Sequence, residues 1–137
     1  MKDINCYLTF DGNCKDAMKF YEKCLGAALY MSPFAEIPGG QIPPGSKDRI
    51  MHARLNVGDC VLMASDTMPG HPFTKGNNFS VSINCESKAE VDKYFNALKE
   101  GGKVTMPAQD MFWGAYFGML TDKFGINWMF NHDIPKN

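Results

Sequence analysis

The order of predicted elements is the same in the two halves of this 137-residue chain, and this repeat limits the possible folds more than any other feature. In each half, a strand of alternating polar and apolar residues precedes a helix, a short strand and a pair of longer strands. The sequence therefore predicts an α+β fold, with one domain over residues 1–137 made of two βαβββ modules. We expect the first module over about residues 1–66 and the second over about 78–132, with residues 67–77 as a linker.

Helix signals occur at the same place in both halves. Asn13 with Asp16 three residues later, and Ser87 with Glu90, predict N-terminal caps, and glycine follows the end of each helix. The strands are expected, in chain order, at residues 5–10, 28–31, 50–57, 60–65, 78–83, 103–106, 112–121 and 126–131. A Pro-containing loop is expected after each short strand. The longer of these loops, residues 32–49, is either a lid over a site or disordered.

The spacing of apolar residues predicts which side chains face the core. The predicted core residues are Cys6, Leu8, Phe10, Phe79, Val81 and Ile83 on the strands, and Ala17, Phe20, Tyr21, Cys24, Val91, Tyr94, Phe95 and Leu98 on the helices.

Composition excludes several classes of protein. Lys+Arg 14 against Asp+Glu 15 leaves no basic excess, so we expect no nucleic-acid binding. No apolar run approaches the roughly 20 residues that a membrane helix needs, and the N-terminus has no apolar signal segment, so we expect a cytoplasmic protein. The five cysteines have no CxxC spacing, which predicts buried, reduced thiols rather than disulfides or a zinc site.

Two segments carry a family resemblance. They are Tyr7-Leu8-Thr9-Phe10-Asp11-Gly12-Asn13-Cys14 with Ala17, Phe20-Tyr21 and Leu25-Gly26 after it, and Phe112-Trp113-Gly114-Ala115 leading to Thr121-Asp122-Lys123-Phe124-Gly125-Ile126-Asn127-Trp128. Both resemble the PhnB-like branch of the vicinal oxygen chelate (glyoxalase/bleomycin resistance/dioxygenase) superfamily. The resemblance implies a curved mixed sheet forming a cup, with the helices on its convex side, and a homodimer. The two modules could pair within one chain or exchange between two chains.

Proteins with this resemblance are often labelled demethylubiquinone methyltransferase-like. The sequence has no Gly-rich strand-to-helix turn of the Rossmann type that would support that label. In metal-using members of the superfamily, His or Glu residues of the cup bind the metal. The matching positions here are Asn5, Met63, Asn78 and Met129. Because amides and thioethers bring no negative charge to a divalent cation, we expect no metal and no other cofactor.

Other residues are expected to face the cup. The strand alternation that buries Leu8 and Phe10 directs Tyr7 and Thr9 to the opposite side, and the same rule selects Ser80. His52 and Arg54 share a strand face, where an imidazole and a guanidinium could hold an anionic ligand. The expected ligand-binding set is completed by Met63, Trp113, Tyr116 and Met129.

The sequence leaves two functions open. The first is a metal-independent small-molecule-binding protein that acts by sequestration, as resistance proteins of this superfamily do. The second is an enzyme of the same fold that performs acid–base chemistry, an isomerase or a lyase, with His52 as the candidate catalytic base.

Overall fold

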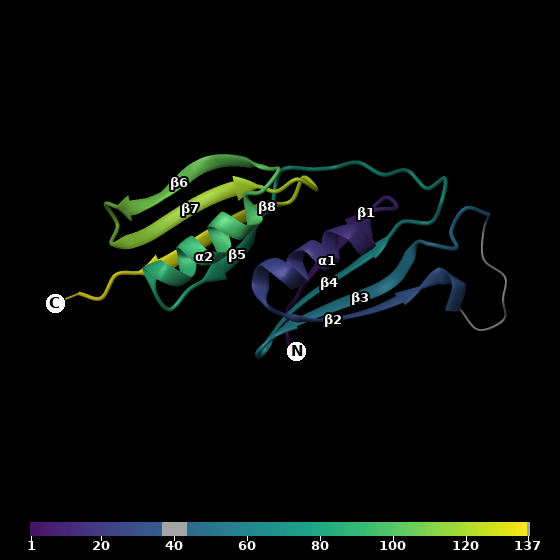
Figure 1. The fold of residues 1–137 in the computed structure, drawn as a ribbon, viewed down its shortest axis with the longest axis horizontal. Coiled ribbons are helices and arrows are strands. Elements are labelled where there is room, and N and C mark those ends of the chain that lie inside the picture. Colours follow the sequence, from purple (N-terminus) through teal and green to yellow (C-terminus); the bar gives the residue numbers. More distant parts are fainter. Residues whose placement is uncertain (37–43, 137) are drawn as a thin grey trace. The chain divides into compact units, whose positions relative to one another are not determined.

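The computed structural model describes residues 1–36 and 44–136, which form two compact units, Met1–Thr74 and Lys75–Asn137. Each unit has the predicted element order, strand, helix, and three further strands (Figure 1). Residues 37–43, in the middle of the loop expected to be a lid or disordered, lie outside the described residues.

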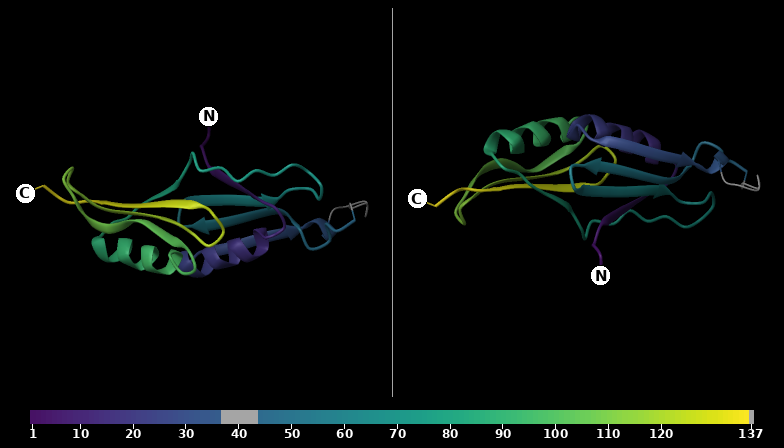
Figure 2. Two further views of the ribbon diagram at one scale, coloured as in Figure 1. Left: turned by 90° about the horizontal axis from the view of Figure 1, so that it is seen from above. Right: turned by 90° about the horizontal axis from the view of Figure 1, so that it is seen from below.

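The first unit is a four-stranded mixed sheet with one helix. Its elements are β1 (Cys6–Phe10), α1 (Cys14–Leu25), β2 (Ala28–Pro33), the short 3-10 helix η1 (Phe34–Glu36), β3 (Ile50–Val57) and β4 (Cys60–Asp66). The strand order is β1-β4-β3-β2, with β1 parallel to β4 and the other pairs antiparallel. Helix α1 contacts β2, β3 and β4 and so covers one face of this sheet (Figure 2).

The second unit repeats this topology. Its elements are β5 (Val81–Asn84), α2 (Lys88–Leu98), β6 (Lys103–Met111), β7 (Ala115–Thr121) and β8 (Asn127–Asp133). The order β5-β8-β7-β6, with β5 parallel to β8, matches the first unit strand for strand. The predicted α+β fold of two βαβββ modules is confirmed. Of the helices in residues 1–36 and 44–136, none combines the length and apolar character that crossing a bilayer requires.

The predicted core faces are largely confirmed, because Leu8, Phe10 and Tyr21 are buried in the first unit, and Val91 and Leu98 in the second. The prediction is wrong for Phe79, whose side chain is 49% exposed. Strand β5 begins only at Val81, so Phe79 precedes the paired part of the sheet, and its place in the alternation no longer sets its burial.

The predicted break after residue 106 is wrong, since β6 continues through Pro107 to Met111. A proline is tolerated here because β6 is the edge strand and its pairing with β7 shifts register between Met106 and Gln109. The segment 112–114 forms the turn between these two strands, whereas alternation had placed it in the second strand. Gly114 in this turn has φ +91°, a conformation that favours glycine.

The two helices begin in different ways. In α2 the predicted capping box is confirmed in part: Ser87 Oγ accepts a hydrogen bond from Glu90 N at 3.1 Å, while Glu90 Oε1 accepts one from Glu86 N at 3.3 Å. Asn13 makes no such bond for α1. The buried carboxylate of Asp66 takes over that role from the end of β4.

Asp66 joins three parts of the first unit. Its Oδ1 accepts hydrogen bonds from Gly12 N (2.7 Å) and Cys14 N (3.0 Å), and its Oδ2 accepts one from Ile50 N (2.8 Å). The carboxylate therefore satisfies donors at the start of α1, where negative charge is favourable, and at the start of β3.

A second buried carboxylate, Asp122, closes the turn between β7 and β8. Its Oδ1 accepts hydrogen bonds from Phe124 N (2.8 Å) and Ile126 N (3.0 Å). Its Oδ2 accepts one from the indole Nε1 of Trp128 at 2.8 Å. These bonds explain why the 121–128 segment has a carboxylate near its start and an indole on the following strand: the two groups bind each other and close the turn.

Candidate ligand-binding face

The first unit's sheet has one face against α1 and one face without a helix. Ala53, Leu55 and Ala64 are buried on the α1 side, so the residues that alternate with them lie on the other side. We call this second side the helix-free face. It carries Tyr7 and Thr9 from β1, Met63 and Ser65 from β4, His52, Arg54 and Asn56 from β3, and Tyr30 from β2.

Strand register arranges four of these residues in one row. Tyr7 is paired with Met63, Met63 with Arg54, and Arg54 with Tyr30, so the row crosses all four strands. Tyr7 is 47% exposed and Tyr30 63% exposed. The sequence predicted Tyr7, Met63 and Arg54 as ligand-binding residues but not Tyr30, because the pattern along one strand does not say which residue of the next strand lies beside it.

Tyr7 and His52 are in direct contact on this face. Tyr7 Oη and His52 Nδ1 lie 3.2 Å apart, and the two ring centroids lie 5.9 Å apart at an interplanar angle of 36°. Since β4 separates β1 from β3, the tyrosine side chain must extend across β4 to reach the imidazole. The hydrogen bond occupies Nδ1 and leaves Nε2 for another partner.

The two arginines of the chain have different surroundings. Arg49 forms an ion pair with Asp11 at 2.9 Å and donates to the backbone oxygen of Thr67 at the same distance. The hydrogen bond from Arg49, followed by the one from Thr67, lowers the pKa of the Asp11 carboxyl. Arg54 instead donates from Nε to Asn56 Oδ1 at 3.1 Å, and it forms no ion pair within the described residues.

None of the residues that strands β1 to β4 place on the helix-free face has a carboxylate. The only acidic residue in β1 to β4 is Asp66, and its side chain is buried against the start of α1. His52 and Arg54 are therefore basic side chains on a face that has no acidic side chain from its own strands. This face can donate hydrogen bonds to an anion and has nothing on its strands to repel one.

The residues at the predicted metal-ligand positions do not fit a divalent cation. Met63 is paired with Tyr7 and Met129 with Ser82, each in the parallel strand pair of its own sheet. The two thioethers and two amides at these positions, Met63, Met129, Asn5 and Asn78, form a poor donor set for such an ion. Among the described residues, no group of three or more His, Cys, Asp or Glu could hold a metal.

In the second unit, the predicted site residues divide between the two faces of the sheet. Met129 lies opposite α2 together with its neighbours Ser82 and Met119, and the ring of Trp113 contacts that of Phe117 on this side, with centroids 5.7 Å apart. Tyr116 lies on the α2 side.

Tyr116 was predicted to line the ligand site, but its side chain lies on the side of the sheet that α2 covers. Its hydroxyl donates to Asp92 Oδ1 of α2 at 2.6 Å, and this bond is the main reason that the pKa of the tyrosine rises to about 12. The Nζ of Lys88 lies 5.4 Å from the ring centroid. Alternation would have separated Tyr116 from Phe117 if the start of β7 had been known, because neighbours in a strand point to opposite faces.

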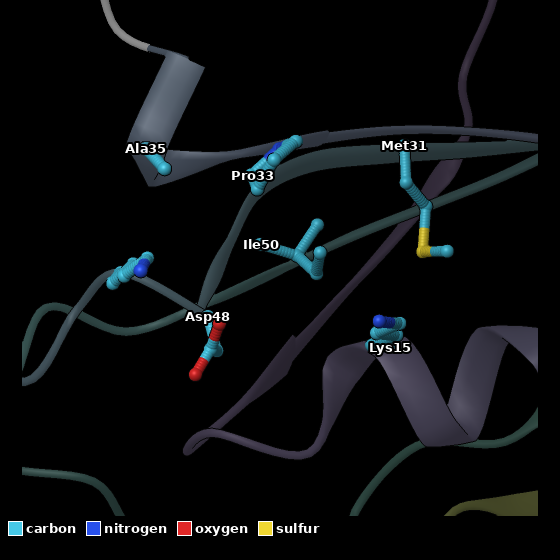
Figure 3. Close-up of a pocket in the computed structure, with 7 residues that line it drawn as sticks. Lys15, Met31, Pro33, Ala35, Asp48 and Ile50 are labelled. Carbon is cyan, nitrogen blue, oxygen red and sulfur yellow. The ribbon is translucent and has the colours of Figure 1, made fainter.

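A separate hollow of about 370 Å³ lies on the α1 side of the first unit (Figure 3). Met31, Pro33 and Ile50 give it an apolar wall, and Figure 3 shows Met31 pointing towards Lys15 at the start of α1. Ala35, Lys47 and Asp48 complete the lining. None of the residues selected from the sequence as ligand-binding belongs to this hollow.

Four of the five thiols are fully or partly buried from solvent, and none of the five forms a disulfide in the structure. Burial is the main cause that raises the pKa of Cys14 to about 12 and that of Cys85 to about 11. Burial also raises the pKa of half-buried Cys6, and Cys24 is buried, whereas Cys60 is exposed at the start of β4.

Iodoacetamide at pH 8 should therefore modify Cys60 first in the native protein, because the thiolate is the reactive form and needs access to the reagent. Peptide mass spectrometry over a time course would show Cys14 and Cys85 modified only after unfolding in denaturant. Native labelling of Cys14 at the rate of Cys60 would contradict the burial described above.

Comparison with solved structures defines the class of fold. A glyoxalase-related enzyme from Fulvimarina pelagi matches with a TM-score of 0.64 over 97% of this chain and 89% of that chain, at 16% identity. At this identity the match shows the fold alone, which is the glyoxalase/bleomycin-resistance fold. Within this class, the chain belongs to the PhnB-like family whose model is described as 3-demethylubiquinone-9 3-methyltransferase and matches residues 2–130.

More similar proteins support the same family. Protein YjdN of Escherichia coli is 35% identical, and the match covers 93% of each chain. Protein PA1353 from Pseudomonas aeruginosa is 47% identical, with a TM-score of 0.89 over 98% of this chain and all of that chain. A PhnB protein from Bacillus cereus, described as a putative 3-demethylubiquinone-9 3-methyltransferase, is 27% identical with a TM-score of 0.78, over 96% of this chain and 99% of that chain.

Proposed function

We propose that this protein binds a small molecule without a metal, and that its binding surface includes the helix-free face of the first unit. The observation that carries the proposal is the row Tyr7, Met63, Arg54 and Tyr30, in which aromatic and thioether surface flanks a guanidinium. Ligand sites in proteins typically combine apolar surface with a few polar groups that fix orientation. We further propose that the protein acts as a cytoplasmic homodimer and sequesters its ligand.

A ligand of this face should stabilise the folded protein. Thermal-shift screening against aromatic and phosphonate-like compounds should find compounds whose effect saturates, with about 2.7 kcal/mol of stabilisation at 100 times Kd. Replacement of Met63 by Gln should weaken binding about tenfold, because it removes apolar contact at the centre of the row.

The matched control is Met68→Gln, since Met68 is 38% exposed and lies beyond the end of β4. This variant should keep the affinity of the parent protein. If no compound in either class gives saturable stabilisation, the proposed binding function is wrong. Elemental analysis after dialysis adds a second check, and stoichiometric divalent metal in the protein would overturn metal independence.

The contact between Tyr7 and His52 allows a second candidate function, acid–base catalysis, in one of the two tautomers of the imidazole. If Nδ1 carries the proton and donates it to Tyr7 Oη, then Nε2 has a free lone pair and could act as a base. Replacement of His52 by Gln separates the two functions: an enzyme would keep ligand binding and lose turnover. Absence of turnover in both the parent and the variant would leave binding as the function.

A further inference from the structure

We propose that the helix-free face of the first unit recognises the anionic oxygen group of an otherwise apolar small molecule. Arg54 and Nε2–H of His52 bind the oxyanion, and Tyr7 is a positioning residue that sets the tautomer of the imidazole. This inference rests on the proposed binding function and adds the chemical class of the ligand.

The charges on the helix-free face favour an anionic ligand. The chain as a whole has a formal net charge of -1, yet this face has a guanidinium and an imidazole and no carboxylate from its four strands. The contrast with Arg49 is informative, because that arginine is neutralised by Asp11 at 2.9 Å. Arg54 has an amide oxygen as its partner, so its positive charge remains available to a ligand.

The positions of His52 and Arg54 allow both side chains to bind the same anionic group. His52 and Arg54 are two residues apart on β3, which separates their Cα atoms by about 6.6 Å on the same face. The bond from Arg54 Nε to Asn56 Oδ1 restrains the guanidinium and leaves its two Nη groups as donors. A carboxylate or phosphonate offers several oxygens and can accept from both side chains at once.

The hydrogen bond with Tyr7 determines the tautomer of the His52 imidazole. A phenol is a better hydrogen-bond donor than acceptor, so the bond of 3.2 Å is best formed with the Tyr7 hydroxyl donating to Nδ1 of a neutral imidazole. The ring proton then lies on Nε2, which becomes a donor for an anion and has no free lone pair. The same geometry that suits anion binding therefore argues against His52 as a base.

The rest of the row fits the apolar part of such a ligand. Met63 lies between Tyr7 and Arg54, and Tyr30 lies on the other side of Arg54. Aromatic rings and a polarizable thioether give contact surface for a planar or aliphatic group. An arylphosphonate or an aryl carboxylate has both parts, whereas inorganic phosphate has only the charged one.

Isothermal titration at pH 8 with phenylphosphonate, benzoate and the neutral ester dimethyl phenylphosphonate tests the charge requirement. At least one of the two anions should bind 10-fold or more tightly than the ester. The anion that binds more tightly shows whether the face prefers phosphonate or carboxylate oxygens. Replacement of Arg54 by Gln should weaken binding of that anion about 30-fold and leave the ester unchanged.

Lys19→Gln is the matched control, because it removes the same charge from an exposed position on α1, on the other side of the sheet. It should leave all affinities unchanged. An equal loss in the two variants would mean that net charge, and not this face, governs binding. Anion and ester binding with equal affinity would overturn the inference and leave small-molecule binding intact, whereas the absence of any binding compound would overturn both.

Side-chain ¹⁵N NMR provides a test that does not depend on variants. In the free protein, the His52 ring should show the Nε2–H tautomer, and the better anion should shift the signals of His52 Nε2 and Arg54 Nε. Tyr7→Phe should release the preference for that tautomer and weaken anion binding while the fold is kept. An Nδ1–H tautomer in the parent protein would overturn the role given to Tyr7, and unshifted signals at saturating anion would overturn the site.

Discussion

Replacement of Asp66 by alanine should lower the free energy of unfolding by about 3–5 kcal/mol, one of the two largest effects expected in this chain. The carboxylate accepts three backbone hydrogen bonds, from Gly12, Cys14 and Ile50. Alanine leaves these donors without an acceptor and also removes the negative charge at the start of α1. Chemical denaturation would give the magnitude.

Hydrogen exchange would show where the loss occurs. The amides of Cys14 and Ile50 should lose protection in Asp66→Ala more than amides elsewhere in β3 and α1. Asp16→Ala is the control, since Asp16 is exposed in the first turn of the same helix and makes no capping bond; its effect should stay within about 1 kcal/mol. Equal destabilisation by the two substitutions would contradict the role of Asp66.

Replacement of Asp122 by alanine should cost about 3 kcal/mol or more in the second unit. Here the loss includes the indole hydrogen bond of Trp128, a side chain that is only 1% exposed, together with the two backbone donors of the turn. The fluorescence of Trp128 should also change in the folded variant. Asp133→Ala, at the exposed end of β8, should have an effect within about 0.5 kcal/mol.

A double-mutant cycle isolates the indole bond. Asp122→Asn keeps an oxygen for the turn amides but places an NH₂ group opposite the indole N–H, and Trp128→Phe removes the indole donor. The two changes should couple by about 1 kcal/mol, because once the donor is gone the amide no longer opposes it. Strict additivity would show that the hydrogen bond contributes nothing.

The periodicity of the sequence was enough to predict the fold. The repeated order of elements, the bounds of β3 and the cap at Ser87 are confirmed, because each depends on residues close together in the chain. The cap of α1 was missed for the opposite reason, since its acceptor is Asp66, more than 50 residues away from Gly12 and Cys14. The continuation of β6 through Pro107 was missed because tolerance of proline depends on which strand is at the edge.

The candidate site was predictable residue by residue but not as an arrangement. Alternation placed Tyr7, His52 and Arg54 on the correct side of their strands. It could not show that Tyr7 extends across β4 to His52, or that Tyr30 completes the row.

The distant carboxylate at α1 has a consequence for the order in which the units consolidate. The start of α2 is stabilised by Ser87 and Glu90, which are already adjacent when that stretch of chain emerges from the ribosome. The start of α1 lacks its acceptor until residue 66 has been synthesised and β4 has closed a loop of more than 50 residues. Although it comes first in the chain, α1 therefore receives this capping acceptor only when its own sheet is complete.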